Sequence, residues 1–149
     1  MENRLQRPLS KCMALCSRSE KCVFDIQKKL SEWEIDEKDA LQIIDELKEQ
    51  RFLNDERYAV IFARDKFRFN HWGRVKIAYH LKNKNIEQKI IFDALDEIGD
   101  DEYFEKLTEM LKQKSRSVKG ASDYEKKAKL IRFAQGRGFE YEIIKKALQ

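Results

Sequence analysis

Apolar residues recur every three or four positions along most of the chain, a spacing typical of amphipathic α-helices. Ile43, Ile44 and Leu47 form one such face, and Ile91 and Leu95 belong to another. Helix-breaking residues are scarce, with five glycines and one proline in 149 residues. The sequence therefore predicts an all-α protein.

Interruptions of this pattern divide the chain into nine expected helices. Asn54 or Asp55 can cap one of them through a side-chain oxygen, and Ser19-Glu20 can cap another. Gly99 is suited to end a helix, because glycine adopts a positive φ at low cost. We expect a loose end before residue 9, around Pro8, and a flexible connector over residues 112–122. The expected helices cover residues 9–18, 20–33, 36–52, 55–69, 74–84, 87–98, 100–111, 123–135 and 139–148.

A six-residue pattern occurs three times and indicates an internal repeat. Each copy begins and ends with an apolar residue, and the copies are residues 30–35, 81–86 and 134–139. The register continues without gaps to further apolar positions, namely Ala40, Ile91 and Ile144, then Ile44, Leu95 and Leu148. A lone unit of this size is only marginally stable, which favours stacking of neighbours. We therefore expect three tandem three-helix, helix-turn-helix-like repeats, over residues 1–53, 54–99 and 100–149.

Charge is distributed in blocks along the chain, whose net charge is +4. Residues 51–89 carry +6, residues 90–110 carry −7 and residues 111–149 carry +7. Residues 64–84 hold seven lysines and arginines against one acid, Asp65, so this face is not neutralised by its own sequence. Two basic blocks around an acidic one suit a protein that meets both nucleic acid and a protein surface.

Aromatic residues are interleaved with the first basic block. Such rings can stack on unpaired bases, but core packing is the commoner role for residues at helical spacing. We expect core positions for Tyr58 and Phe67, and an apolar helix face made of Tyr58, Ile61, Phe62 and Phe69. Trp72 falls in a turn at residues 70–73, so we expect it near the surface.

No arrangement of residues suggests catalysis or a bound cofactor. Cys12, Cys16 and Cys22 lie far from the two histidines, whereas a closed zinc site needs four ligands. Gly136 and Gly138 follow a helix rather than a strand, so they predict a turn and not a phosphate-binding loop. The longest apolar run, residues 58–63, is far shorter than the roughly 20 residues of a membrane span. The N-terminus has no apolar stretch, so we expect a cytoplasmic protein. Because no catalytic or metal-binding arrangement is evident, we also expect a non-enzymatic protein without a metal.

The central residues resemble those of a known family. The motif begins with Asp55-x-Arg57-Tyr58-Ala59-x2-Phe62-x-Arg64-x-Lys66 and continues with Trp72-Gly73-Arg74-x-Lys76-Ile77-x3-Leu81-x2-Lys84-x-Ile86. This sequence is similar to the central motif of the RecX family, bacterial regulators of the RecA recombinase. Asn85 stands where the family often has glycine, and Tyr58 where phenylalanine is common. Together with the threefold repeat, the resemblance extends over nearly the whole chain.

The resemblance implies a curved, elongated molecule that binds RecA–single-stranded-DNA filaments and limits their extension or activity, in recombination, DNA repair and the SOS response. It makes RecA and single-stranded or duplex DNA the expected partners of a monomer. A sequence-nonspecific helix-turn-helix-type DNA-binding protein without a RecA role and a helical scaffold are the alternatives. The expected contact residues are one tryptophan and the cations of both basic blocks, namely Arg57, Arg64, Lys66, Arg68, Trp72, Arg74, Lys76, Lys82, Lys84, Lys112, Lys114, Arg116, Lys126, Lys127, Arg132 and Arg137.

Overall fold

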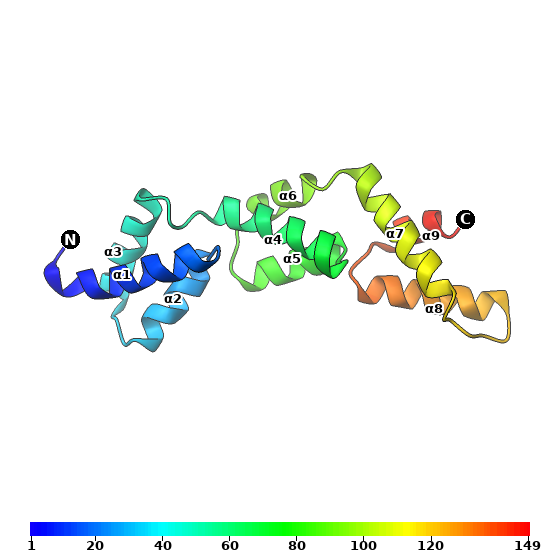
Figure 1. Cartoon of the computed structure of the whole chain (residues 1–149), viewed down its shortest axis with the longest axis horizontal. Helices are drawn as coiled ribbons and strands as arrows, with labels where there is room; N and C mark the ends of the chain where they lie inside the picture. The colour runs from blue at the N-terminus through cyan, green and yellow to red at the C-terminus, as the bar shows by residue number, and fades with distance from the viewer.

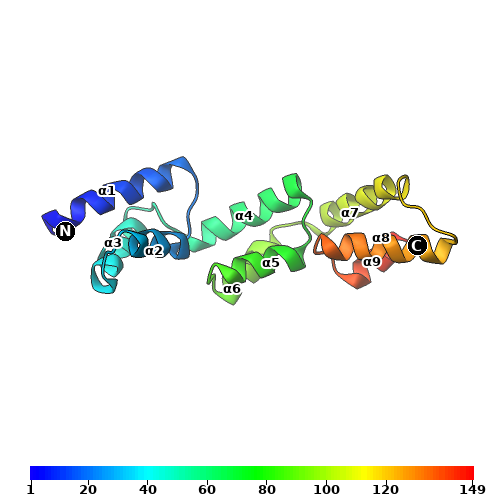
Figure 2. The same ribbon diagram turned by 90° about the horizontal axis from the view of Figure 1, so that it is seen from below.

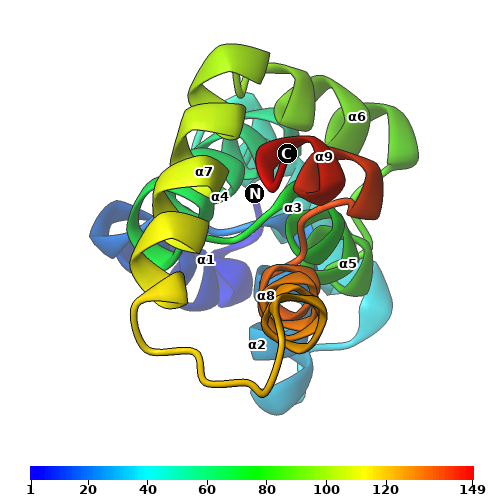
Figure 3. The same cartoon turned by 90° about the vertical axis from the view of Figure 1, so that its right-hand side faces the viewer.

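The computed structural model describes all residues 1–149 as nine α-helices without a strand. The helices form a row of three repeats with the termini at opposite ends (Figure 1). The first helices of the repeats follow one another along one side of the row (Figure 2), and in an end-on view the third repeat lies in front, with helices of the other two visible around it (Figure 3). The helices are α1 (Asn3–Arg18), α2 (Val23–Glu32), α3 (Glu37–Glu49), α4 (Asp55–Asn70), α5 (Arg74–Asn83), α6 (Gln88–Asp96), α7 (Asp100–Ser115), α8 (Asp123–Gly136) and α9 (Tyr141–Ala147). The predicted all-α, three-repeat architecture is confirmed.

All three copies of the six-residue pattern fold into the same turn structure. Its fifth residue is Glu34, Asn85 or Gly138, and each adopts a positive φ, at 59°, 57° and 94°. The sixth N–H returns to the first carbonyl in each copy: Ile35 to Leu30 at 3.0 Å, Ile86 to Leu81 at 3.2 Å and Phe139 to Ala134 at 3.1 Å. This left-handed C-terminal cap satisfies helix-end carbonyls and places the last apolar residue in the core. The sequence repeat is therefore a structural repeat.

Side-chain caps begin several helices. The Asn54 carboxamide oxygen accepts a hydrogen bond from the Arg57 N–H at 2.9 Å, as predicted, and Asp36 accepts from the Asp39 N–H at 2.8 Å. The cap predicted at Ser19-Glu20 is wrong, because α2 begins after Cys22. There the Asp25 carboxylate accepts the Cys22 N–H at 3.3 Å, so an acid in the first turn supplies the cap.

The N-terminal residues are helical, so the prediction of a loose end is wrong. Helix α1 includes Pro8, although proline removes one backbone hydrogen bond. Leu5 and Leu9 are buried on either side of it in the core of the first repeat. Arg4 also forms a two-hydrogen-bond ion pair with Asp39 of α3. These tertiary contacts offset the cost of the proline, which sequence periodicity alone could not show.

Two further local predictions need correction. Gly99 is not a left-handed cap, since α6 ends at Asp96 and Gly99 has φ −62° as the residue that precedes α7. The connector predicted over residues 112–122 begins later, because α7 continues to Ser115. Strong helix formers such as Lys112 and Lys114 extend the helix beyond the last buried residue, Leu111.

The buried residues form two separate cores. Nine form the core of the first repeat, and nineteen form a second core that is built by the second and third repeats together with Cys22 of the first. Tyr58 and Phe67 are buried, as predicted, whereas Phe69 is 75% exposed and its assignment to the apolar face is wrong. Ala59 and Ala63 occupy that face instead, because small side chains allow neighbouring helices to approach closely. No helix of the chain combines the length and the apolar character that crossing a membrane requires.

Candidate nucleoprotein interface

The turn between α4 and α5 presents an aromatic ring at the surface of the second repeat. Helix α4 ends at Asn70, and His71 takes a left-handed conformation with φ 58°. The Trp72 N–H then donates to the Lys66 carbonyl at 3.0 Å, which holds the indole against α4 and α5. Trp72 is half-buried, in agreement with the expected position near the surface.

Two lysines converge on this indole. The Lys66 ammonium lies 5.0 Å and the Lys76 ammonium 4.8 Å from the centroid of the Trp72 ring, and Phe62 packs edge-on at 6.3 Å. No ion pair of the molecule includes either lysine. The indole face favours nearby cations, but it does not neutralise their charge. The arrangement therefore leaves two positive charges free for an external anion.

His80 completes the cluster, with its ring 4.6 Å from the Trp72 ring. Burial, together with the neighbouring positive charges of Lys76 and Lys66, lowers the pKa of His80 below its ordinary value. The imidazole is consequently neutral at neutral pH. A bound anion would offset the repulsion from the lysines and raise this pKa again.

A second group of cations adjoins the first across the joint with the third repeat. Lys114 of α7 and Arg137 after α8 lie 5.0 Å and 5.5 Å from the Phe133 ring centroid. The Arg137 guanidinium also donates to the Asn70 carbonyl at 3.4 Å, so it contacts the end of α4. His71 lines the adjacent pocket of about 280 Å³ together with Phe133, Lys114 and Arg137. We call the combined area the basic aromatic surface: Lys66, Trp72, Lys76, His80, Lys114, Phe133 and Arg137.

Three predicted contact residues form ion pairs within the protein. Arg57 pairs with Glu20 at 2.8 Å, and Lys84 pairs with Asp25 at 2.6 Å. Arg74 donates to Asp100 at 2.9 Å. Arg68 is exposed, with a weaker contact to Glu102 at 3.3 Å. The other predicted cations are exposed and have no ion pair: Arg64, Lys82, Lys112, Arg116, Lys126, Lys127 and Arg132.

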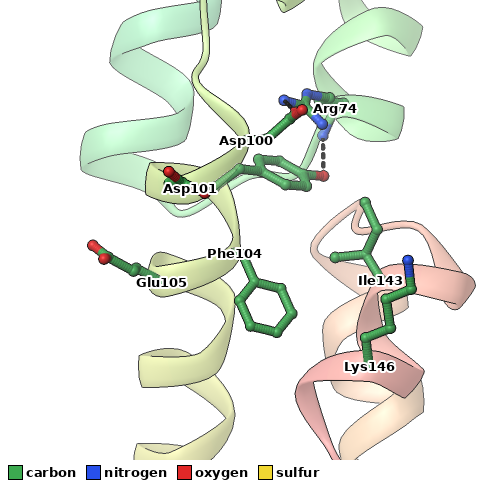
Figure 4. Close-up of a pocket in the computed structure, with 8 residues that line it drawn as sticks. Arg74, Asp100, Asp101, Phe104, Glu105, Ile143 and Lys146 are labelled. Carbon is green, nitrogen blue, oxygen red and sulfur yellow. Dashed lines mark hydrogen bonds and ion pairs between the residues drawn. The ribbon is translucent and has the colours of Figure 1, made fainter.

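Arg74 illustrates how a basic motif residue can serve the fold. Its backbone N–H donates to the Tyr103 hydroxyl at 2.9 Å, and its guanidinium lies 4.1 Å from the ring centroid of the same tyrosine. The Tyr103 hydroxyl donates in turn to Glu140, and burial together with this hydrogen bond raises the pKa of Tyr103. Figure 4 shows the adjoining pocket of about 530 Å³, where Phe104 of α7 points toward α9. Arg74 thus joins the second repeat to the third.

The residues that sequence reasoning missed in the basic aromatic surface are His80 and Phe133. Both lie four positions from a predicted cation, since His80 follows Lys76 and Phe133 precedes Arg137. Residues four apart share one helix face, so an aromatic ring four positions from a predicted contact cation is the sequence feature that could have indicated these two residues.

The cysteines take no part in this surface. All three are free, and burial raises the pKa of Cys12 to about 11 and that of Cys22 to about 12. They are therefore protonated thiols at neutral pH, packed as small apolar side chains. No three His, Cys, Asp or Glu residues come together in a way that could hold a metal ion.

Comparison with known proteins places these repeats in a family. Residues 54–95 match the family model described as the second three-helix domain of RecX, and residues 100–148 match the third. The chain is 34% identical over 139 residues to the regulatory protein RecX of Acinetobacter baylyi, covering 93% of this chain and 84% of the relative. It is 31% identical over 144 residues to that of Clostridium acetobutylicum, covering 94% of this chain and 66% of the relative.

Solved structures agree with this relationship at the level of the fold. The crystal structure of RecX from Lactobacillus salivarius superposes with a TM-score of 0.90 at 23% identity, over 97% of this chain and 94% of that one. A second crystal structure of regulatory protein RecX gives a TM-score of 0.89 at 21% identity, over 97% and 73% of the two chains. From the matched domains and the identity to its relatives, the chain belongs to the RecX family of regulatory proteins.

Proposed function

We propose that this protein is a non-enzymatic regulator of RecA, which binds RecA–single-stranded-DNA filaments in the cytoplasm as a monomer and limits their extension or activity. The main support is the pair of unneutralised lysines on Trp72, in a molecule whose other motif cations largely stabilise the fold. The elongated row of repeats also suits a partner that is itself a long fibre (Figure 1).

The basic aromatic surface supplies the contact in this proposal. Lysine and arginine next to a polyanion release condensed counterions, which gives affinity that depends strongly on salt and little on sequence. The half-buried indole beside these two lysines could also contact a base or a sugar of an unpaired strand. His80 has a lowered pKa in the free protein and would gain a proton when phosphate approaches, so binding should strengthen as the pH falls through the higher pKa that His80 has in the complex.

Reversing charge on this surface tests the proposal. We expect the double variant Lys66→Glu/Lys76→Glu to lose about tenfold or more in retention on RecA–DNA filaments and to lose inhibition of strand exchange, because two phosphate-facing charges become repulsive. The control is Arg7→Glu/Arg18→Glu, the same charge change at two exposed sites on α1. Circular dichroism would verify that both variants remain helical. Full inhibition by the first variant would remove this surface from the proposal.

A second candidate function is DNA binding without RecA, which the same unneutralised lysines favour. The wild-type protein distinguishes the two at physiological salt, on naked single-stranded DNA and on RecA–DNA filaments. Stronger retention on filaments supports the RecA proposal. Equal retention on both, with a steep salt dependence, supports simple DNA binding, and retention on neither supports a helical scaffold.

A further inference from the structure

Two grooves in the first and second repeats occupy equivalent positions. One lies between α2 and α3 with a volume of about 290 Å³, and the other lies along α5 and α6 with a volume of about 390 Å³. The repeat register relates residues 51 positions apart in the first two repeats. Three pairs of lining residues correspond in this register: Gln27 and Ala78, Leu41 and Phe92, and Ile44 and Leu95.

Each groove exposes a large apolar side chain at the same position of the third helix. Leu41 is 52% exposed and Phe92 is 68% exposed. Neither packs into the core of its own repeat, which instead buries Ile43 or Ile91 from the same helix. Single exposed apolar residues are common, but the same exposure at two equivalent sites beside a groove indicates an anchor point for a partner.

The third helices that carry these anchors are acidic. Helix α3 (Glu37–Glu49) holds five acids and two lysines, a net charge of −3, and α6 together with its flanking acids Glu87 and Glu97 holds four acids and one lysine, also a net charge of −3. Asp96, Asp100 and Glu140 line the second groove together with Arg74, which pairs with Asp100 and Glu140 and leaves Asp96 unpaired, and Glu37 lines the first groove. A segment that presents lysine or arginine around a large apolar side chain would complement both the charge and the shape of each groove.

The third repeat departs from this pattern. Lys145 stands at the position of Leu41 and Phe92, and residues 140–149 have no net charge. The chain therefore has two acidic grooves with apolar anchors and, beyond them, the basic aromatic surface. A protein polymer presents the same segment at regular intervals, once on each subunit. Two equivalent grooves on one row of repeats could therefore bind that segment on two neighbouring subunits.

We propose that the α2–α3 and α5–α6 grooves dock the same basic segment, through an apolar side chain, from two neighbouring subunits of a filamentous protein partner. This inference rests on the proposed function, in which that partner is the RecA filament. It assigns protein contact to the acidic grooves and leaves nucleic-acid contact to the basic aromatic surface. Two weak sites on one rigid row reinforce each other, so the loss of either lowers the overall affinity.

Site-specific photo-crosslinking tests the inference directly. A benzophenone amino acid would replace Leu41, Phe92 or, as the matched control, Lys145, and each full-length protein would be irradiated with RecA–single-stranded-DNA filaments. We expect positions 41 and 92 to label one and the same lysine- or arginine-containing stretch of RecA, and position 145 not to label it. Labelling of DNA, of a second copy of this chain or of unrelated RecA stretches would overturn the inference.

Substitutions provide the second measurement. Leu41→Gln and Phe92→Gln remove the anchors without changing charge, and both sites are exposed, so the fold is retained. We expect each to weaken retention on filaments about tenfold, as loss of an interface anchor does, and Lys145→Gln to change it less than twofold. Unchanged retention of both anchor variants would overturn the groove inference alone, whereas failure of the wild-type protein to bind filaments would overturn the proposed function as well.

Discussion

The two joints between neighbouring repeats are built from different interactions. At the first joint, charged side chains cross from one repeat to the other: Arg57 to Glu20, Lys84 to Asp25, and Asp55 to the Val23 N–H at 2.9 Å. The side chains of Arg57 and Lys84 remain 36% and 37% exposed. Exposed ion pairs contribute little stability and are screened by salt, typically within about 1 kcal/mol each.

The second joint is a continuous core with paired backbones. The rings of Phe67, Tyr103 and Phe139 lie in contact across it, with centroids 5.6 Å and 4.9 Å apart. The Gly73 N–H donates to the Arg137 carbonyl at 2.7 Å, and the Val75 N–H donates to the Gly138 carbonyl at 3.0 Å. Glycine permits this approach, because a Cβ on Gly73 would lie 2.4 Å from the Gly138 oxygen.

This difference indicates that the second and third repeats unfold together, and that the first repeat unfolds more independently. Cys22 is the only first-repeat residue buried in the larger core. The two tryptophans report on the two parts, since Trp33 packs against the first core and Trp72 against the second. Variants that keep one tryptophan, Trp72→Phe or Trp33→Phe, therefore allow each part to be followed by fluorescence during urea unfolding.

The largest expected effect comes from adding a methyl group at the second joint. Gly138 has φ +94°, and a Cβ there would lie 2.3 Å from the Lys76 Cβ and 2.6 Å from the Lys76 backbone nitrogen. Strain at a left-handed residue together with overpacking should cost Gly138→Ala about 3 kcal/mol or more. We expect the free energy of unfolding measured from Trp72 fluorescence in urea to fall by that amount, and the value measured from Trp33 fluorescence to stay unchanged.

Gly136→Ala is the matched control in the same turn. A Cβ at Gly136 meets nothing within 4 Å, and its φ is not positive. Alanine at such a position stabilises by about 0.4–1 kcal/mol, because it restricts the unfolded chain. Equal behaviour of the two alanine variants would contradict the close backbone contact at the second joint.

An intermediate effect is expected from Tyr103→Phe. The Tyr103 hydroxyl accepts the Arg74 N–H and donates to Glu140, so its removal leaves two buried or half-buried groups without their partner. The expected loss is about 1–3 kcal/mol in the free energy of unfolding measured from Trp72 fluorescence. Tyr58→Phe serves as control, since the Tyr58 hydroxyl makes no hydrogen bond within the protein, and it should change stability by less than about 0.5 kcal/mol. A smaller loss for Tyr103→Phe than for Tyr58→Phe would exclude the hydroxyl as a link between the repeats.

The turns were predictable because their information is local. Six residues with apolar ends and a helix on each side determine the cap, so the sequence repeat places Glu34, Asn85 and Gly138 at one equivalent position, where all three adopt a positive φ. The wrong predictions concern positions where tertiary packing determines whether a residue is helical or buried. Leu5 and Leu9 stabilise a helix through Pro8, and alanines rather than Phe69 face the core of the second repeat.

The candidate site was predictable only as a region. Lys66, Trp72 and Lys76 stand in one motif, so their convergence follows from a turn of known length. Arg57 and Lys84 belong to the same motif, but their acidic partners lie 37 and 59 residues away. Sequence spacing does not reveal such distant pairs, and a basic motif consequently mixes residues that stabilise the fold with residues that are free to bind.

The smallest expected effect lies at the first joint. Lys84→Met removes the ion pair to Asp25 while keeping an apolar stem over the Phe24 ring, which the Lys84 ammonium faces at 5.7 Å. Since the lysine is partly exposed, the expected loss is about 0.5–1 kcal/mol at low salt. It should shrink in 0.5 M salt, because added ions weaken the wild-type pair and leave the variant unaffected. The loss would be measured as the change in the free energy of unfolding in urea, followed by Trp33 fluorescence.

Acid titration of the same two proteins tests the cause of this effect. Burial tends to raise the pKa of Asp25, but hydrogen bonds from the Lys84 ammonium and the Cys22 N–H outweigh it, so this pKa lies below its ordinary value. A lowered carboxyl pKa contributes stability that is complete above about pH 4 and is lost as the pH falls through the folded-state pKa. The stability difference between wild type and Lys84→Met should therefore disappear in acid. If it persisted at pH 2, the methionine would be acting through packing on Phe24, and the first joint would resemble the second more closely than its ion pairs indicate.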